Sequence, residues 1–411
     1  MEKVICFRNI GELIQVDPGE ETPKLVRKTK CALLVVNGRV SRVIRDSRID
    51  PEKYSKVIDC GGKSVVPGLV DCHTHLIYAG ERKDEMEQRA SGTPYMQILK
   101  NGGGILGTVK ATRKATEDEL YASAMKRVRR MMTLGTTAFE IKSGYGLDLD
   151  TEMKMLKVGQ RLKKSLKIPI TLTYLGAHAV PKGQKISRYF EFVMEHLPKF
   201  RDLVDGVDIF CERDVFTVAD LRRLFLHAKL VGFHQLRAHV EELSHQGGCY
   251  NAARLGAISC DHLEYATAHD IRAMQLSGTT AVLMPGVTFF LGGKRLPLVH
   301  AMIDAGVTLA LATDCNPGSG PSYNMQTVLT LAHSLYRIHP EQALIAGTYG
   351  SARALDGHVD YGGLLPGQRA DFLVLKTNDY RDLFYYFGEN FVDQTWSAGK
   401  KVKAWKDPVA L

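Results

Sequence analysis

The segment that decides the fold reads Leu69-Val70-Asp71-Cys72-His73-Thr74-His75-Leu76-Ile77-Tyr78. It continues an apolar, β-branched run from Val65 to Val70 that only Pro67-Gly68 interrupts, and the run ends in His73-x-His75. Alternate side chains of an extended strand point to the same side, so His73 and His75 can reach one metal ion together. The segment therefore predicts a buried strand that delivers two metal ligands.

Short apolar runs and amphipathic helical patterns alternate through the middle of the chain. Besides the run near Leu69, the predicted strands cover residues 137–141, 169–176, 207–211, 233–239, 258–262, 280–284 and 309–313. The predicted helices cover residues 116–134, 150–166, 218–231, 267–276, 297–305 and 324–337. Eight strands that alternate with helices predict an α/β fold, a parallel (β/α)8 barrel of the TIM type, whose reactive residues lie at the C-terminal ends of the strands.

Both ends of the chain contain short runs of residues typical of β-strands. The clearest case near the start is residues 31–44, with Asn37-Gly38 as a hairpin turn, and similar runs return at 364–375 and 397–402. We expect the two ends to pair into one small β-sandwich domain, formed by residues 1–67 and 360–411. The barrel domain would then cover residues 68–359.

Composition is that of an ordinary globular protein, because 45% of the 411 residues are hydrophobic and 24% are charged. No apolar run reaches the ~20 residues that a membrane span requires, so we expect no membrane-spanning segment. The first residues lack the pattern of a signal peptide, which predicts a cytoplasmic protein. The eight cysteines include no Cys-x-x-Cys pair, which favours free thiols in a reducing compartment.

The formal net charge is +9, from 54 Lys and Arg against 45 Asp and Glu. Such a balance could serve nucleic acid or an anionic metabolite. Basic residues such as Lys154, Lys157 and Arg161 are scattered along a predicted helix without interleaved aromatic residues, as on a solvated helix face. We therefore expect a small anionic substrate and no nucleic acid.

Four side chains at predicted strand ends form a candidate metal site. His73 and His75 end the first strand, His239 the fifth, and Asp314 follows the eighth. Three imidazoles and one carboxylate suit a divalent ion such as Zn²⁺ or Fe²⁺ if one position stays open for water. Each residue alone is a weak signal, but their joint placement at strand ends is hard to obtain by accident.

Hydrolysis at such a site also needs groups that carry protons. Glu242, three residues after His239, and His262, at the end of the sixth strand, are the candidates. Glu241 is a competing carboxylate that could instead be solvated.

The chain resembles the amidohydrolase superfamily over nearly its whole length. The resemblance lies in the motif Pro67-Gly-Leu-Val-Asp-x-His-x-His75, the histidines of strands five and six, and the aspartate of strand eight. More narrowly, the chain resembles the imidazolonepropionase family of histidine degradation. The motifs that carry this resemblance are His75-Leu-Ile-Tyr-Ala-Gly-Glu-Arg82, Gly102-Gly-Gly-Ile-Leu-Gly-Thr-Val-Lys-Ala-Thr-Arg113, Lys142-Ser-Gly-Tyr-Gly-Leu147, Leu175-Gly-Ala-His-Ala-Val-Pro181 and Thr313-Asp-Cys-Asn-Pro-Gly-Ser319.

The resemblance implies a role for each matching residue. The implied metal ligands are His73, His75, His239 and Asp314, which hold one Zn²⁺ or Fe²⁺ per chain. The implied substrate contacts are Arg82, Tyr145, His178, Glu242, Asn316, Gly318 and Ser319. An Arg fork matches a propionate carboxylate, and Tyr and His supply further polar contacts.

The implied reaction opens the cyclic amide of imidazolone propionate to N-formimidoyl-L-glutamate by attack of a metal-bound hydroxide. Asp314 or His262 would accept the proton of the water, and Glu242 would relay a proton to the departing nitrogen. His178 or the metal would polarise the ring carbonyl. The order of these transfers stays open.

Two departures from the family patterns narrow these expectations. Many amidohydrolases hold two metals that a carboxylated lysine of strand four bridges, whereas this strand offers Cys211 and Glu212, so we expect one metal. The segment Arg237-Ala-His239-Val-Glu-Glu242 also replaces the His-Ala-Asp-Glu of the imidazolonepropionase family, although it keeps the ligand and the glutamate.

The run Gly102-Gly103-Gly104, which has a counterpart in the family, lacks the ending of a phosphate-binding loop. It favours a mobile or tightly turned loop near the site mouth.

Two other functions remain open at this point. The first is a deaminase of a nucleobase-like ring in the same superfamily, because His-x-x-Glu on strand five also suits deamination; Arg82 argues for a substrate with a carboxylate instead. The second is a barrel without catalysis that serves as an assembly module, against which all four ligand candidates count. We expect a homodimer.

Overall fold

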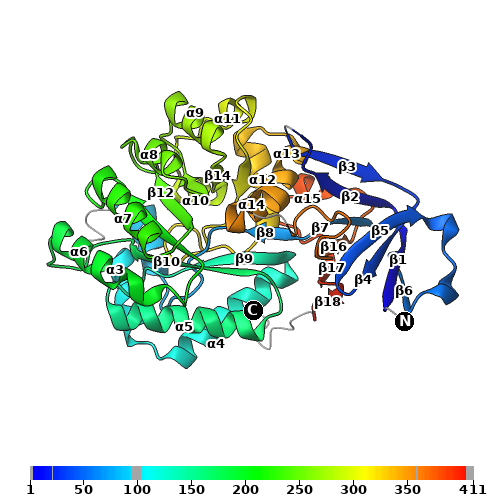
Figure 1. Cartoon of the computed structure of the whole chain (residues 1–411), viewed down its shortest axis with the longest axis horizontal. Coiled ribbons are helices and arrows are strands. Elements are labelled where there is room, and N and C mark those ends of the chain that lie inside the picture. The colour runs from blue at the N-terminus through cyan, green and yellow to red at the C-terminus, as the bar shows by residue number, and fades with distance from the viewer. Residues whose placement is uncertain (1–2, 21, 94–102, 358–359, 404–411) are drawn as a thin grey trace.

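The computed structural model describes residues 3–20, 22–93, 103–357 and 360–403. An eight-stranded sheet in the order β8 to β15 curls into a barrel, and every neighbouring pair is parallel (Figure 1). Its strands are β8 (Leu69–Asp71), β9 (Thr136–Lys142), β10 (Ile170–Ala177), β11 (Gly206–Cys211), β12 (Gln235–Val240), β13 (Ser259–His262), β14 (Thr280–Leu283) and β15 (Leu309–Leu311). The predicted eight-stranded α/β barrel is confirmed.

The barrel closes just beyond the ends of its first and last strands. Thr74 and Cys315 form a parallel bridge there. The amide of His75 donates to the carbonyl of Cys315 at 3.0 Å, and the amide of Asp314 donates to the carbonyl of His73 at 3.1 Å. We call this junction of residues 73–75 with 313–315 the seam. Three of the predicted metal ligands lie on it.

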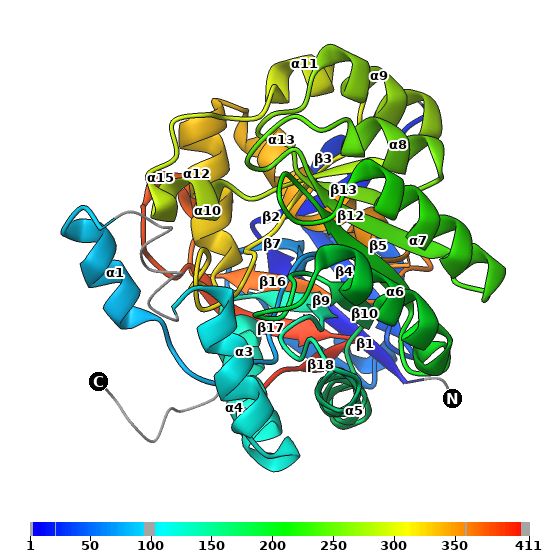
Figure 2. The same cartoon turned by 90° about the vertical axis from the view of Figure 1, so that its left-hand side faces the viewer.

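Helices surround the barrel (Figure 2). They are α1 (Lys83–Ala90), α3 (Ile105–Lys114), α4 (Glu117–Thr133), α5 (Leu149–Ser165), α6 (Ile186–His196), α7 (Val218–Leu230), α8 (Gly248–Arg254), α9 (Ala268–Ser277), α10 (Pro285–Leu291), α11 (Val299–Asp304), α12 (Met325–Tyr336), α13 (Pro340–Ile345), α14 (Ser351–Asp356) and α15 (Asp382–Tyr385). Short 3₁₀ helices cover Asp46–Arg48, Pro51–Lys53 and Leu197–Phe200, and a π-helix covers Ala346–Gly350.

Helix α4 shows why these segments are helical and how they pack. Thr116 and Glu119 form a capping box at its N-terminus, which satisfies free backbone N–H groups there. The side chains of Leu120, Ala124 and Val128, at three- and four-residue spacing, are buried on its inner face. The periodic pattern in the sequence therefore predicts both the helix and the face that it buries.

The two chain ends build two smaller sheets, which lie to the right of the barrel in Figure 1. One has the order β5 (Arg39–Arg45), β4 (Cys31–Val36), β1 (Val4–Ile10) and β6 (Lys56–Asp59). The other has the order β18 (Lys400–Lys401), β17 (Val392–Ser397), β16 (Phe372–Leu375), β7 (Ser64–Pro67), β2 (Glu12–Asp17) and β3 (Lys24–Lys28). Asn37 and Gly38 form the predicted hairpin turn with φ of 50° and 79°.

A hydrophobic core between these two sheets joins the beginning and the end of the chain. Phe7 of β1 lies 4.9 Å from Phe372 of β16 and 4.7 Å from Trp396 of β17, measured between ring centroids, with both pairs edge to face. Strands β7 and β16 pair directly and antiparallel. The chain ends thus form a sandwich, while the domain limits at 67/68 and 359/360 stay a prediction.

The run from Val65 to Val70, which reads as one continuous strand in the sequence, forms two strands in two different sheets. Strand β7 belongs to the small sheet and β8 to the barrel. The break falls at Pro67 and Gly68. A Cβ on Gly68 would lie 2.2 Å from the Oγ1 of Thr137, so only glycine fits where the chain passes into the barrel. Strand β8 ends at Asp71, and the two histidines follow it.

A lysine that the sequence places on a predicted helix has a structural role. The ammonium of Lys154 donates to the carbonyls of Thr112, Arg113 and Ala115, so this lysine of α5 ties α3 to its neighbour. All eight cysteines are buried free thiols. Within the described ranges, no helix combines the length and the hydrophobicity needed to cross a membrane.

The aromatic core between the small sheets gives a first prediction. Phe372→Ala should lower the free energy of unfolding by about 3–5 kcal/mol, because it removes a fully buried ring that contacts Phe7 and Trp396. Urea unfolding followed by circular dichroism measures this change. The control is Tyr385→Ala, at a side chain that is 80% exposed, which should change stability by no more than about 0.5 kcal/mol. Equal effects of the two substitutions would contradict the prediction.

Candidate active site

Four buried side chains converge at the seam. The Nε2 atoms of His73 and His75 are 3.3 Å apart, and those of His75 and His239 are 3.5 Å apart. Oδ1 of Asp314 lies 3.5 Å from Nε2 of His73 and 3.3 Å from Nε2 of His75. The sequence-predicted ligands therefore lie together around one point, although they come from the first, fifth and eighth strands.

The donor set fits a divalent metal ion. Two ligands that each lie ~2.1 Å from a tetrahedral ion are about 3.4 Å apart, which matches the spacing of these atoms. His73 and His239 direct Nδ1 at carboxylates and therefore carry their hydrogen there, so the bare Nε2 atoms face the other ligands. Lone pairs that face one another at this distance offer a place for a cation between them.

Two carboxylates that the sequence analysis missed orient these histidines. Nδ1 of His73 donates to Asp261 at 2.6 Å, and Nδ1 of His239 lies 3.1 Å from Asp208. Such partners set the tautomer and the ring orientation of a metal ligand. Asp261 stands next to His262 and Asp208 lies on the predicted fourth strand, so an acidic residue inside an apolar strand is the signal that could have found them.

The ionisation of the four side chains suits metal binding. Burial lowers the pKa of His73 well below its ordinary value and also lowers the pKa of His75, so both are neutral ligands. Burial acts to raise the pKa of Asp314, but its hydrogen-bonding contact with His75, with smaller effects of the nearby His262 and His239, outweighs burial. The pKa of Asp314 is therefore lowered and the carboxylate stays ionised.

The loop after β15 holds Asp314 in place. The side-chain amide of Asn316 donates to Oδ2 of Asp314 at 2.8 Å and to the hydroxyl of Ser319 at 2.8 Å. Its carbonyl oxygen accepts from the amides of Gly318 and Ser319. The predicted substrate contacts Asn316 and Gly318 are thus engaged within their own loop, where they orient a ligand, and the Ser319 hydroxyl lies 3.2 Å from the same carboxylate.

His262 and Glu242 form a pair beside the metal ligands. Nε2 of His262 lies 3.7 Å from Oε2 of Glu242, and the His262 ring lies 5.3 Å from that of His239. Burial acts to lower the pKa of His262, but Glu242, Glu264 and Asp314 outweigh it, so the pKa is raised. The Glu242 side chain is 18% exposed, which leaves it open to a substrate.

The structure distinguishes Glu242 from its neighbour Glu241. The Glu241 carboxylate accepts from the backbone amides of Gln246 and Cys249, so it shapes the loop after β12. Glu212, at the end of strand four, accepts from the amides of Leu243 and Ser244 and thereby holds the same loop. Glu242 is the carboxylate of the three that faces His262.

His178 and Tyr145 lie on the other side of the ligands. The His178 ring stacks on that of His75 with centroids 4.9 Å apart, and the Tyr145 ring lies 5.4 Å from His178. Nδ1 of His178 donates to the carbonyl of Gly144, so its Nε2 is a bare acceptor. Burial lowers the pKa of His178 well below its ordinary value, which opposes a second proton. Polarisation of a carbonyl, one of the roles expected of His178, would need a proton on Nε2 and stays a prediction.

Arg82 packs against the loop that carries Asp314. A Cβ on Gly318 would lie 2.0 Å from Nη1 of Arg82, so a glycine is needed for this approach. Nη2 of Arg82 donates to Glu85 at 2.6 Å, whereas its Nε is buried without a hydrogen-bond partner among the described residues. The guanidinium of the predicted carboxylate-binding residue thus already pairs with one carboxylate, that of Glu85.

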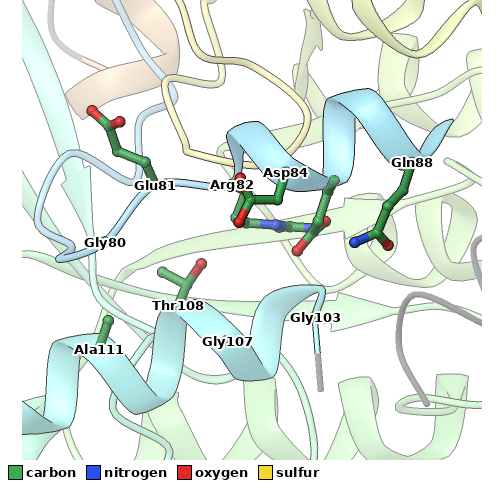
Figure 3. Close-up of a pocket in the computed structure, with 10 residues that line it drawn as sticks. Gly80, Glu81, Arg82, Asp84, Gln88, Gly103, Gly107, Thr108 and Ala111 are labelled. Atoms are coloured by element: carbon green, nitrogen blue, oxygen red, sulfur yellow. The ribbon is translucent and has the colours of Figure 1, made fainter. Parts of the chain in front are cut away.

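A cavity of about 290 Å³ lies beside Arg82, between α1 and α3. Figure 3 shows Arg82 and Gln88 on one side of it and Thr108 on the other. Gly104 begins α3 with φ of 69°, and its amide donates to Glu85. The predicted glycine-rich turn thus borders this cavity at Gly103, while Gly102 lies outside the described residues.

Glu264, two residues after His262, is a further carboxyl group near the site that the sequence analysis did not single out. Its Oε1 lies 3.3 Å from the hydroxyl of Thr288, and its Oε2 is buried with no hydrogen-bond partner in the described part of the chain. Burial, opposed by His262 and reinforced by Glu242, raises the pKa of Glu264 to about 7.

Known proteins resemble this chain over nearly its whole length. Residues 291–402 match the Amidohydrolase family. The chain is 40% identical over 390 residues to the imidazolonepropionase of Polaromonas sp., a match that covers 92% of this chain and 91% of that protein. It is 38% identical over 403 residues to the imidazolonepropionase of Bacillus thuringiensis, which covers 95% of each.

Solved structures share the fold at lower identity. An adenosine deaminase from Xanthomonas campestris with bound zinc gives a TM-score of 0.71 at 19% identity, covering 97% of this chain and 92% of that one. A guanine deaminase from C. acetobutylicum with bound guanine gives 0.68 at 14%, covering 98% and 100%. A triazine hydrolase variant gives 0.73 at 15%, covering 97% and 94%. This likeness concerns the fold alone.

The raised pKa of Glu264 predicts a pH dependence of stability. Between the ordinary value of 4.5 and about 7, the folded chain holds a proton that the unfolded chain releases, so this group stabilises the fold increasingly as the pH falls. From about pH 8 to about pH 5, the wild type should gain about 2 kcal/mol relative to Glu264→Gln, which has no such proton. Urea unfolding of both proteins at both pH values measures this difference, and a difference that does not change with pH would contradict the prediction.

Proposed function

The chain belongs to the imidazolonepropionase family of amidohydrolases, and on this basis we propose that it hydrolyses imidazolone propionate to N-formimidoyl-L-glutamate in histidine degradation. The observation that carries the proposal is the convergence of His73, His75, His239 and Asp314 at the spacing of metal ligands. We further propose that these four side chains hold one ion of zinc or iron, since three imidazoles and a carboxylate suit both metals.

A divalent ion at this place supplies a Lewis acid and lowers the pKa of a bound water toward ~7. The protein must then move protons. Hydrolysis joins the oxygen of water to the ring carbonyl carbon, breaks the carbon–nitrogen bond and delivers a proton to the departing nitrogen. We assign acceptance of the water's proton to His262 or Asp314, and delivery to the nitrogen to Glu242, because His262 and Glu242 lie 3.7 Å apart beside the metal ligands.

The remaining polar groups position the substrate in this proposal. The bare Nε2 of His178 accepts an N–H of the ring, which replaces the carbonyl contact expected from the sequence. Arg82, whose guanidinium already pairs with the Glu85 carboxylate, binds the propionate carboxylate, and Tyr145 and Ser319 add hydroxyl groups nearby. A neutral His178 beside a cationic Arg82 matches a substrate with one polar ring and one anionic arm.

The two contacts that lie within the Asp314 loop have a different role. We propose that Asn316 and Gly318 serve the substrate indirectly, by fixing Asp314 and by admitting Arg82. The enzyme acts on a small molecule, and its homodimeric state and cytoplasmic location stay predictions.

Metal content and activity of one purified sample test the proposal. The chain should carry about one equivalent of zinc or iron and should convert imidazolone propionate to N-formimidoyl-L-glutamate. Removal of the ion with a chelator should abolish the conversion, and Zn²⁺ or Fe²⁺ should restore it. Ammonia release from guanine without hydrolysis of imidazolone propionate would identify a deaminase instead. No bound ion and no hydrolysis would identify an inactive barrel.

Substitution of the proposed proton carriers tests their roles. Glu242→Gln and His262→Ala should each lower turnover by ~100-fold or more at unchanged metal content, because each removes a group that donates or accepts a proton. The control is Glu191→Gln, at a carboxylate of α6 that is 60% exposed and pairs with Arg223 on the surface, and it should retain turnover. Near-normal turnover in either of the first two variants would remove that residue from the mechanism.

A further inference from the structure

A lysine lies at the centre of the barrel, on the inner side of the metal ligands. The Lys142 side chain of β9 is fully buried. Its ammonium lies 2.6 Å from Asp208, 2.8 Å from Glu140 and 3.5 Å from Asp261. An ammonium group has three N–H donors and a compact charge, so it can serve three carboxylates that approach from different strands.

Two of these carboxylates are the ones that orient the metal ligands. Asp208 lies against Nδ1 of His239 at 3.1 Å, and Asp261 accepts from Nδ1 of His73 at 2.6 Å. Lys142 is therefore linked to two of the four ligands through one carboxylate each. Its own chain also meets the seam, because its amide donates to the carbonyl of Thr74 at 2.9 Å.

The space around the ammonium has the composition of a second cation site. Asp208, His239 and Asp261 offer ligand atoms that all lie within 4.8 Å of one another. The ammonium of Lys142 lies against two of these three groups, so a side chain of the protein supplies the positive charge there. Burial acts to lower the pKa of Lys142, but the carboxylates of Asp208, Glu140 and Asp261 outweigh it and raise the pKa, so the cation is permanent.

We propose that Lys142 is a positioning residue of the metal centre, a built-in cation that holds Asp208 and Asp261 where they fix His239 and His73. Without it, two buried carboxylates would face each other with less opposing charge and would turn away from the positions in which they accept the Nδ1–H bonds. The Nε2 atoms would then lose their common direction, and the ion would bind more weakly. This inference rests on the metal site of the proposed function.

Arg237 provides a matched comparison within the same network. It is also a fully buried cation of the barrel, on the neighbouring side of Glu140, with Nε 3.1 Å from that carboxylate. Its other guanidinium bonds go to Gln235 and to the backbone carbonyls of Ala354 and Leu355. Loss of Arg237 thus removes a buried charge without removing the partner of Asp208 and Asp261.

The test compares metal affinity in three metal-free proteins, namely the wild type, Lys142→Met and Arg237→Met. Each is titrated with Zn²⁺ against a chromophoric chelator, and circular dichroism verifies that each is folded. Lys142→Met should bind Zn²⁺ about 10- to 100-fold more weakly, the range seen when the outer partners of metal ligands are lost. Arg237→Met should bind as the wild type does. With Co²⁺ in place of Zn²⁺, the visible absorption of a tetrahedral site should weaken in Lys142→Met alone.

Each other outcome has a defined meaning. Wild-type affinity in Lys142→Met would overturn the inference, and so would an equal loss in Lys142→Met and Arg237→Met, since that would reflect a general effect of losing buried charge. A wild type that binds neither ion would instead overturn the metal site of the proposed function. If Lys142→Met does not fold, Lys142→Gln, which keeps an N–H donor without the charge, is judged by the same criteria.

Discussion

The hydrogen bonds that close the barrel at the seam are the constraint on which the site depends. The backbone of residues 73–75 pairs with that of residues 314–315, and this pairing sets His73, His75 and Asp314 side by side. The same backbone hydrogen bonds therefore close the barrel and bring these three predicted ligands together. Asp71 strengthens the junction, because its carboxylate accepts from both the amide and the hydroxyl of Thr313. A barrel that failed to close would have two ligands on one edge and one on the other.

Beneath the seam, buried charges are arranged in layers. The neutral histidines point their Nε2 atoms outward to the ion position and their Nδ1 atoms inward to Asp208 and Asp261. The next layer holds the cations of Lys142 and Arg237 with Glu140. Burial of a lone carboxylate is costly, and Asp208, Asp261 and Glu140 each lie against the ammonium of Lys142. These contacts orient the Nε2 atoms of the histidines toward the ion position without the help of an ion.

Much of the fold could be predicted from the sequence, because its signals are local. Periodicity predicts the helices and the barrel strands, and Asn37-Gly38 predicts a hairpin. The family, too, follows from motifs that the full-length relatives confirm. The run from Val65 to Val70 shows the limit of local signals. Its residues are apolar throughout, yet its two halves lie in different sheets. The break depends on the close contact of Gly68 with Thr137, which lies far along the chain and cannot be predicted from the run itself.

The sequence by itself determined that the predicted ligands lie at or just beyond the C-terminal ends of strands, because the order and polarity of parallel strands follow from the alternation of strands and helices along the chain. Only the tertiary structure decided which groups stand behind them. Asp261 reaches His73 across 188 residues of chain and Asp208 reaches His239 across 31, and no periodicity encodes such pairs. It also decided that Nδ1 of His178 faces the carbonyl of Gly144 and that Asn316 donates to Asp314, because a side chain's hydrogen-bonding partners are supplied only by folding.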